Sequence, residues 1–273
     1  MAQTSNLGER MKGYEAVSKT ILVRRVPVII RLDGKAFHTF TKGLQKPFDA
    51  IMSYAMQETM HSLCKEIQGC VFGYTQSDEI TLVLADYFKL DTSPWFDYEV
   101  QKMCSVAASM ATIFFNRYFD DGVKRACEIR DSVNLPYGDS KMYTSLESYE
   151  RHLEMMPVFD ARCFNIPLSE VTNNIYWRQR DATRNSIQAA AQANFSHKQI
   201  QGCNCDKLQD MLFKEFNINW NDYPTVFKRG CSCYKKPMNN GYEEKVWFVD
   251  FNMPILTGDG RNHVEQHIIP SED

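Results

Sequence analysis

Hydrophobic and polar positions alternate with two different periods along the first part of the chain. Positions spaced three to four residues apart predict helices over residues 49–67 and 97–119. Dense runs of β-branched and apolar residues predict strands over residues 23–33, 70–76, 79–86 and 157–164. The resulting order, strand–helix–strand–strand–helix–strand, is that of a ferredoxin-like unit. We therefore expect an α+β fold, with an antiparallel sheet and helices on one face.

The pattern changes after Pro167. Residues 169–194 predict a long helix and residues 204–216 a shorter one. The region of residues 225–252 carries two β-like runs, PTVFKRG and KVWFVDF, and each predicts a strand. The last stretch, GDGRNHVEQHIIPSED, is polar and predicts a tail.

These patterns suggest two domains. Residues 1–167 would form the sheet domain, with an insertion of loops and short helices at about residues 120–156. Residues 168–273 would form a mostly helical C-terminal part that closes against it.

Composition and charge narrow the possible classes of protein. The 273 residues are 44% hydrophobic and 24% charged, which is ordinary for a globular protein. The net charge of −3 means that binding of a nucleic acid would require a local basic surface. The N-terminal stretch MAQTSNLGERMKGYE has no apolar signal region, and no run approaches the roughly 18 apolar residues typical of a membrane span. We expect a cytoplasmic protein that does not enter the membrane.

The nine cysteines are expected to be reduced thiols. Cys203 and Cys205 form one Cys-x-Cys pair, and Cys231 and Cys233 form a second. Four thiolates can hold zinc, but zinc sites usually have two or more residues between paired cysteines. We therefore expect surface or core cysteines rather than a structural zinc site.

Two predicted strands each carry a carboxylate at one end. Asp33 closes the apolar run VPVIIRLDG, and Asp78 lies in the turn of GYTQSDEITLVL. In an antiparallel sheet these two ends can be neighbours, and two adjacent carboxylates repel unless a cation neutralises them. Mg²⁺ prefers such oxygen ligands, and Gly34 can expose its carbonyl to the same ion. The arrangement indicates a two-metal phosphoryl-transfer site; the alternative is that both residues merely form turns.

Other residues near these strand ends are candidates for phosphate binding. The backbone N–H groups of DGKAFH, residues 33–38, can cradle a triphosphate. Arg31, Lys35 and Lys46 add positive charge, and each has the alternative of a solvated surface cation. Arg162 can meet the same phosphates or pair with Asp160. His38 can contact base or ribose or be structural.

These motifs carry a family resemblance. VIIRLDGKAFHTFTKGLQKPFD (28–49) followed by GYTQSDEITLVL (73–84) resembles the motifs Arg-Ile-Asp-Gly-Arg-x-Phe-His, Lys-Pro-Asn-Asp and Gln-Ser-Asp-Glu of the tRNA-His guanylyltransferase family. The resemblance extends from ERMKGYE through FDAR to FKEFNINW. It implies a core like the palm of nucleic-acid polymerases.

The resemblance also implies roles for individual residues. Catalysis would depend on Asp33, Asp78 and Glu79, although Glu79 should point to the opposite strand face from Asp78 unless the turn twists. Asp33, Gly34 and Asp78 would hold two Mg²⁺ ions. ATP and GTP would be substrates, bound by Arg31, Asp33, Gly34, Lys35, Ala36, Phe37, His38, Lys46, Ser77, Asp78 and Arg162.

One motif departs from the family pattern. Enzymes that add the extra guanylate to tRNA-His carry His-Ile-Asn-Asn-Leu-Tyr-Asn, whereas this chain has VTNNIYW at residues 171–177, with Val171 at the His position. The chain thus resembles the guanylyltransferase-like branch, which extends 5′-truncated tRNA by templated 3′-to-5′ addition. Alternatives are addition of a single 5′ G, a palm-type nucleotide cyclase, and a catalytically silent tRNA-binding protein.

The resemblance further implies a tRNA partner and an oligomer, with a tetramer favoured. Trp177 or Tyr176 can stack on an RNA base or belong to the core. The local basic surface would consist of Arg178, Arg180, Arg184, Lys198, Lys228 and Arg229. The alternative is a solvated helix face.

Overall fold

The computed structural model describes residues 2–132, 149–238 and 245–270. Within them, one six-stranded sheet has the strand order β4-β1-β3-β2-β5-β6, and every neighbouring pair is antiparallel. Its strands are β1 (Val28–Gly34), β2 (Cys70–Gln76), β3 (Glu79–Leu84), β4 (Phe159–Asn165), β5 (Cys231–Pro237) and β6 (Lys245–Asp250). The α+β prediction and the antiparallel palm-like sheet are confirmed.

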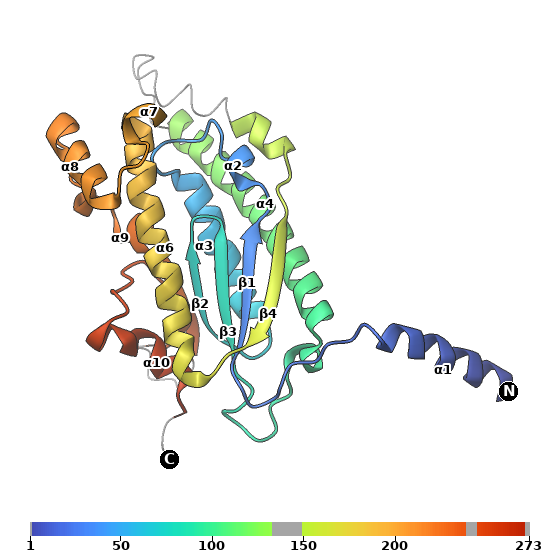
Figure 1. Cartoon of the computed structure of the whole chain (residues 1–273). Helices are drawn as coiled ribbons and strands as arrows, with labels where there is room; N and C mark the ends of the chain where they lie inside the picture. Colours follow the sequence, from blue (N-terminus) through green and yellow to red (C-terminus); the bar gives the residue numbers. More distant parts are fainter. Residues whose placement is uncertain (1, 133–148, 239–244, 271–273) are drawn as a thin grey trace.

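Two helices cover one face of the sheet, α3 (Ala50–Glu66) and α4 (Val100–Ser132), as Figure 1 shows. Asp49 caps α3, because its carboxylate accepts the Met52 N–H at 2.8 Å. The alternate residues of β1 and β3 that face these helices are apolar and fully buried. This layer is the predicted ferredoxin-like unit.

The opposite face is partly covered by α6 (Leu168–Asn194) and α10 (Asn262–Ile268). Val171 and Ile175 of α6 pack with Ile29, Phe72 and Val83 of the sheet. Figure 1 shows α6 crossing in front of the sheet, with β1 and β4 to one side of it. Asp33 and Gly34, at the end of β1, are partly exposed.

The remaining helices lie at the periphery. A small cluster joins α8 (Cys205–Phe216) to the end of α6 through Leu208, Leu212 and Trp220. In the sequence, α7 (His197–Ile200) comes between α6 and α8, and α9 (Thr225–Arg229) leads into β5. The first helix, α1 (Ala2–Ala16), projects away from the body of the molecule (Figure 1).

Two predicted boundaries in the first half are wrong. The first strand begins at Val28 rather than at residue 23, because Arg25 has a left-handed φ of 62° and Pro27 has no N–H donor. The predicted insertion at 120–156 begins with helix, since α4 continues through Ser132 and Val123 extends its buried stripe. A short helix covers residues 149–154, and residues 133–148 lie outside the described residues.

Two predictions for the C-terminal part are also wrong. PTVFKRG forms the helix α9 and not a strand, because Pro224 sets the extended entry and the strand starts only at Cys231. The predicted tail contains α10, whose Val264 and Ile268 are buried against the sheet. KVWFVDF does form β6. The domain boundary at residue 167 stays a prediction; β5, from beyond it, pairs with β2 in the same sheet.

Candidate active site

The end of β1 meets the turn between β2 and β3. The Gly34 N–H donates to the Asp78 carbonyl at 3.0 Å, which joins the two segments directly. Ser77 has a left-handed φ of 50° that makes the turn tight, and its hydroxyl donates to the Asp78 carboxylate at 3.0 Å. The fold therefore brings Asp33 and Asp78 to one edge of the sheet, as the strand ends predict.

The two carboxylates interact electrostatically. Burial raises the pKa of Asp78 above its ordinary value, and the nearby charge of Asp33 raises it further. A hydrogen bond from Ser77 opposes this increase. A cation between the carboxylates would remove their repulsion, so the donor set fits a hard divalent ion such as Mg²⁺.

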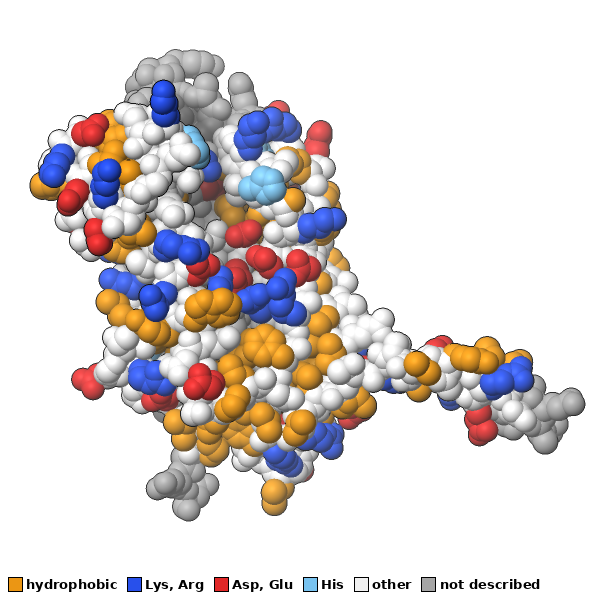
Figure 2. Space-filling view, in the orientation of Figure 1, with side chains coloured by type: hydrophobic (Ala, Val, Ile, Leu, Met, Phe, Trp, Pro, Cys, Tyr) orange, Lys and Arg blue, Asp and Glu red, His pale blue; other side chains and the backbone are white. Residues whose placement is uncertain are grey.

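The register of the strands places charged residues in two rows across the sheet, one acidic and one basic. Asp33 lies opposite Glu79 on β3 and Asp160 on β4. Arg31 lies opposite Arg162 on β4, and directly opposed residues share a face of the sheet. Figure 2 shows acidic side chains gathered beside Lys and Arg side chains over this part of the molecule. The face combines potential cation ligands with potential phosphate ligands.

The Glu79 carboxylate forms an ion pair with Arg178. Its Oε1 accepts the Arg178 Nε–H at 2.6 Å, and both side chains are less than a tenth exposed. A second nitrogen of Arg178 donates to Asp181 at 2.9 Å. Burial raises the pKa of Glu79, and Arg178 counteracts that increase. Glu79 thus links β3 to α6 rather than facing Asp78.

The loop after β1 has one buried and several exposed members. Phe37 is buried against Phe115 and Phe159, with ring centroids 5.2 and 5.1 Å away. A Cβ at Gly34 would lie 2.2 Å from the Phe37 ring, so the close approach needs glycine. Lys35 and His38 are exposed. Their positions leave both side chains accessible to a ligand, whereas Phe37 can offer only its backbone.

The backbone N–H groups of this loop are not all free. Gly34 donates to Asp78, and Lys35 donates to the Val158 carbonyl at 2.9 Å. The next residue, Ala36, has a left-handed φ of 55° and precedes α2 (Phe37–Phe40). The first N–H groups of a helix have no acceptor inside it. A phosphate cradle would therefore use residues 36–38 rather than all of 33–38.

The predicted cations differ in their surroundings. Arg162 pairs with Asp160 at 3.1 Å, the alternative that the sequence had left open, but both side chains are about half exposed. Lys46 is exposed. Arg178 and Lys228 are buried, and the Lys228 ammonium donates to the Asn221 carbonyl. Among the predicted tRNA contacts, those with accessible side chains are Arg180, Arg184, Lys198 and the partly exposed Arg229.

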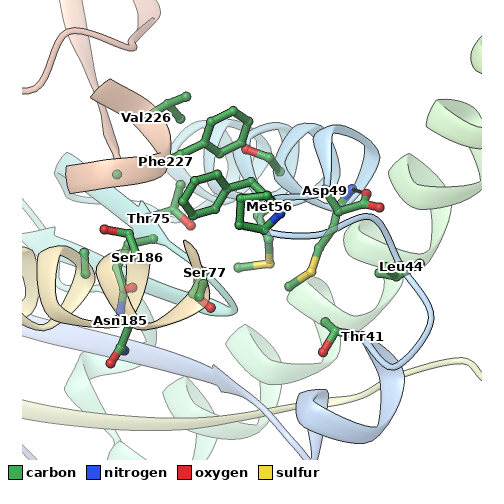
Figure 3. A pocket seen from close by; sticks show the side chains of 18 of the residues that line it. Thr41, Leu44, Asp49, Met56, Thr75, Ser77, Asn185, Ser186, Val226 and Phe227 are labelled. Atoms are coloured by element: carbon green, nitrogen blue, oxygen red, sulfur yellow. Dashed lines mark hydrogen bonds between the residues drawn. The ribbon is translucent and has the colours of Figure 1, made fainter. Parts of the chain in front are cut away.

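A cavity of about 220 Å³ adjoins the Ser77 turn. Figure 3 shows Asn185 and Ser186 of α6 on one side, Thr41 and Leu44 on the other, and Phe227 of α9 above. Phe48 stacks on Phe227 with a centroid distance of 4.8 Å. The sequence patterns did not indicate this cavity, because its walls come from four segments whose relative positions only the folded chain defines.

The two Cys-x-Cys pairs lie in different places. Cys231 and Cys233 belong to the main core, whereas Cys203 and Cys205 pack beside the α6–α8 cluster. In the described ranges, no three His, Cys, Asp or Glu side chains are grouped to hold a metal ion. A cation at Asp33 and Asp78 would thus need backbone, water or phosphate oxygens as well. No helix in the same ranges is long and apolar enough to span a membrane.

Known proteins resemble the chain over most of its length. A bacterial tRNA(His) guanylyltransferase-like protein in complex with ATP is 40% identical, with a TM-score of 0.79, over 96% of this chain and 98% of that one. A second such structure, in complex with GTP, is 36% identical with a TM-score of 0.76, and it covers 97% and 99% of the two chains. A Dictyostelium discoideum protein named "Probable tRNA(His) guanylyltransferase" is 26% identical over 86% of this chain and 85% of its own length.

The family profile described as tRNAHis guanylyltransferase matches residues 8–167, which is more than half of the chain. This range includes β1 to β4 and both members of the Asp33–Asp78 pair. The chain belongs to the tRNA-His guanylyltransferase family, nucleotidyltransferases that add nucleotides to tRNA.

Proposed function

We propose that this chain repairs 5′-truncated tRNA by template-dependent addition of nucleotides in the 3′-to-5′ direction. The observation that carries the proposal is Val171. This residue replaces the His of the tRNA-His-specific motif, and it is fully buried against the sheet among apolar side chains. Its side chain has no hydrogen-bonding group, so it cannot make a side-chain hydrogen bond that favours one nucleotide or one tRNA.

The proposed nucleotide site combines the cavity with the cations at its edge. A planar base fits beside Phe48 and Phe227, and the triphosphate would extend past Ser77 toward the end of β1. Arg31, Lys35, Lys46 and Arg162 would supply positive charge, and the N–H groups of residues 36–38 would bind phosphate oxygens. ATP and GTP are the ligands in the two similar bacterial structures.

Asp33 and Asp78, with the Gly34 carbonyl, would hold Mg²⁺. When bound, Mg²⁺ lowers the pKa of an attacking hydroxyl and neutralises phosphate charge. We assign Glu79 a structural role, because its carboxylate pairs with Arg178.

The reaction requires an activated 5′ end. The RNA carries either a 5′-triphosphate or an adenylylated 5′-monophosphate formed with ATP. The 3′-hydroxyl of the incoming nucleotide loses its proton to solvent, and its oxygen bonds to the 5′ α-phosphorus. The bond from that phosphorus to the leaving-group oxygen breaks, and pyrophosphate or AMP departs. The residues of this chain orient the two reactants in line, which is the main protein contribution in phosphoryl transfer.

The tRNA body would lie on the accessible cations Arg180, Arg184, Lys198 and Arg229. We also propose a homotetramer in the cytoplasm. Leu7, Met11 and Tyr14 are exposed at helical spacing along α1 and would pack against another copy. All nine thiols are free, which suits a reducing compartment. Sedimentation of an active monomer at micromolar concentration would contradict the tetramer.

One assay separates this function from its alternatives. The protein is incubated with Mg²⁺, ATP, GTP and a 5′-truncated tRNA, and the RNA is examined for 5′ extension. Addition limited to a single G on tRNA-His would indicate the guanylyltransferase proper. Formation of a cyclic nucleotide without RNA extension would indicate a cyclase, and binding without any product a silent tRNA-binding protein.

A further inference from the structure

Trp177 is an exposed aromatic residue beside the candidate active site. Its side chain is 53% exposed, whereas the preceding Tyr176 is partly buried against the second core cluster. Trp177 occupies the last position of the altered motif VTNNIYW, where the tRNA-His-specific enzymes have Asn. The fold thus resolves which of the two aromatic residues is available to a partner.

Two guanidinium groups lie next to the Trp177 ring. The Cζ atoms of Arg178 and Arg31 are 4.3 and 5.6 Å from the ring centroid. Arg31 lies on β1 two residues before Asp33, and its Nε is buried without a hydrogen-bond partner among the described residues. The indole therefore borders the rows of charged residues that end at the proposed metal ligands.

Trp177 also begins a basic stripe on α6. Arg180 and Arg184 follow at spacings of three and four residues, so all three side chains share one helix face, and all three are exposed. Figure 2 shows Lys and Arg side chains spread over this face next to the acidic group. An aromatic residue at the end of a basic track is the combination that binds single-stranded nucleic acid.

We propose that Trp177 stacks on the terminal base of the RNA end that is being extended. The proposal rests on the proposed function, since it assigns the RNA end to the open face beside α6. A base offers the flat surface that an indole prefers, and the phosphates on either side of that base would meet the arginines. Stacking would hold the end of the acceptor stem while its 5′ phosphate lies near Asp33 and Asp78.

A protein contact fits this surface less well. If a second copy of the chain covered Trp177 through a two-fold axis, it would bring the same arginines into the contact. Arg31, Arg180 and Arg184 would then face their own counterparts, and like charges at an interface are unfavourable. RNA would supply phosphate charge to these guanidinium groups, of which Arg184 also pairs with Asp181.

The test compares Trp177→Ala with wild type and with Trp177→Phe. The alanine variant should raise the KM for a 5′-truncated tRNA about tenfold, the scale of one lost base–aromatic stack, while the KM for the nucleotide stays unchanged. The phenylalanine variant should retain most of the affinity. Phe213→Ala is the matched control, because Phe213 is 58% exposed on α8 and should leave both constants unchanged.

A direct reading of stacking uses 2-aminopurine as the terminal base of the tRNA. Wild type should quench its fluorescence on binding without any nucleotide present, and Trp177→Ala should not. Equal quenching and equal tRNA affinity in a folded Trp177→Ala variant would overturn the proposal, as would a change of oligomeric state in that variant. Addition of G regardless of template by wild type, with tRNA affinity still lost in Trp177→Ala, would refute only the templated function and support the stacking.

Discussion

At the scale of single residues, the site depends on which charged side chains pair with each other and which remain available to bind a cation. Asp33 and Asp78 are held together by the bond from the Gly34 N–H to the Asp78 carbonyl. Glu79, the sequence neighbour of Asp78, faces Arg178 instead. Adjacent acids in one motif therefore have separate tasks: Asp78 belongs to the proposed cation site, and Glu79 fastens β3 to α6.

Asp33→Asn and Asp78→Asn should each lower the rate of nucleotide addition at least about a hundredfold. Each change removes a negative ligand, and metal ions contribute several kcal/mol of charge stabilisation in the transition state. The rate is measured with labelled tRNA at saturating nucleotide, alongside circular dichroism to check the fold. Asp97→Asn is the control, since that acid is exposed and pairs with Arg24, which precedes the start of β1, whereas Asp33 lies at its end. Near-normal turnover in either site variant would disprove the assignment.

At the scale of elements, α6 connects the sheet, the cavity and the exposed basic stripe. The Arg178–Glu79 pair fixes its rotation over β3, and Asp181 on the same helix holds the Arg178 side chain in place. If the Arg178–Glu79 pair is broken, α6 should no longer be held in one orientation. Asn185 in the cavity wall and Trp177 should then become more mobile.

Arg178→Met should lower the free energy of unfolding by about 3–5 kcal/mol, because it leaves Glu79 buried without a partner. Urea unfolding measures the change. Adding Glu79→Gln to this variant should restore part of the loss, as the uncompensated charge is then removed. Arg180→Met, on the exposed side of the same helix, should change stability by less than about 0.5 kcal/mol. An equally small effect of Arg178→Met would show that the pair does not fasten α6.

The helix α10 introduces a pH dependence. Burial, with His263 and Lys245 nearby, lowers the pKa of His267 to about 4, below the ordinary value near 6.5. Between these values the unfolded chain binds a proton that the folded chain does not, so stability falls as the pH drops from about 6.5 to 4. His267→Phe keeps an aromatic ring against Tyr234 and removes this titration.

The free energy of unfolding of His267→Phe should accordingly decline less than that of wild type over this pH range. Urea unfolding at intervals from pH 4 to pH 7 gives both curves. Parallel curves would mean that His267 does not contribute to acid sensitivity.

The regularity of the hydrophobic pattern determines which elements can be predicted from the sequence. Strands β1 to β4 and helices α3, α4 and α6 have long, regular hydrophobic patterns, and these patterns locate them. By contrast, α10 is buried through only Val264 and Ile268, and its burial depends on contact with the distant sheet. The proximity of Asp33 and Asp78 can be predicted, because both residues lie at strand ends that are neighbours in an antiparallel sheet. The Arg178–Glu79 pair and the cavity cannot, because they depend on where α6 and α9 pack.

At the scale of the whole molecule, α6 borders the cavity through Asn185 and Ser186, reaches Glu79 at the strand end through Arg178, and carries the basic stripe on an exposed face. This order suits a nucleotide in the cavity, a reacting phosphate at Asp33 and Asp78, and an RNA end beside Trp177. In the proposed tetramer, α1 would extend from one copy to another, so that one subunit holds the tRNA body while a second extends its end.

The central claim is that the template base, and not the protein, selects the nucleotide. The most direct measurement varies the base opposite the missing 5′ nucleotide through all four bases and supplies all four nucleoside triphosphates. Only a correct pair places the incoming 3′-hydroxyl in line, and a displacement of about 1 Å costs on the order of a hundredfold in rate. We predict that the added nucleotide follows the complement of the template on tRNAs with different anticodons. Addition of G opposite every base, or addition to tRNA-His alone, would contradict the claim.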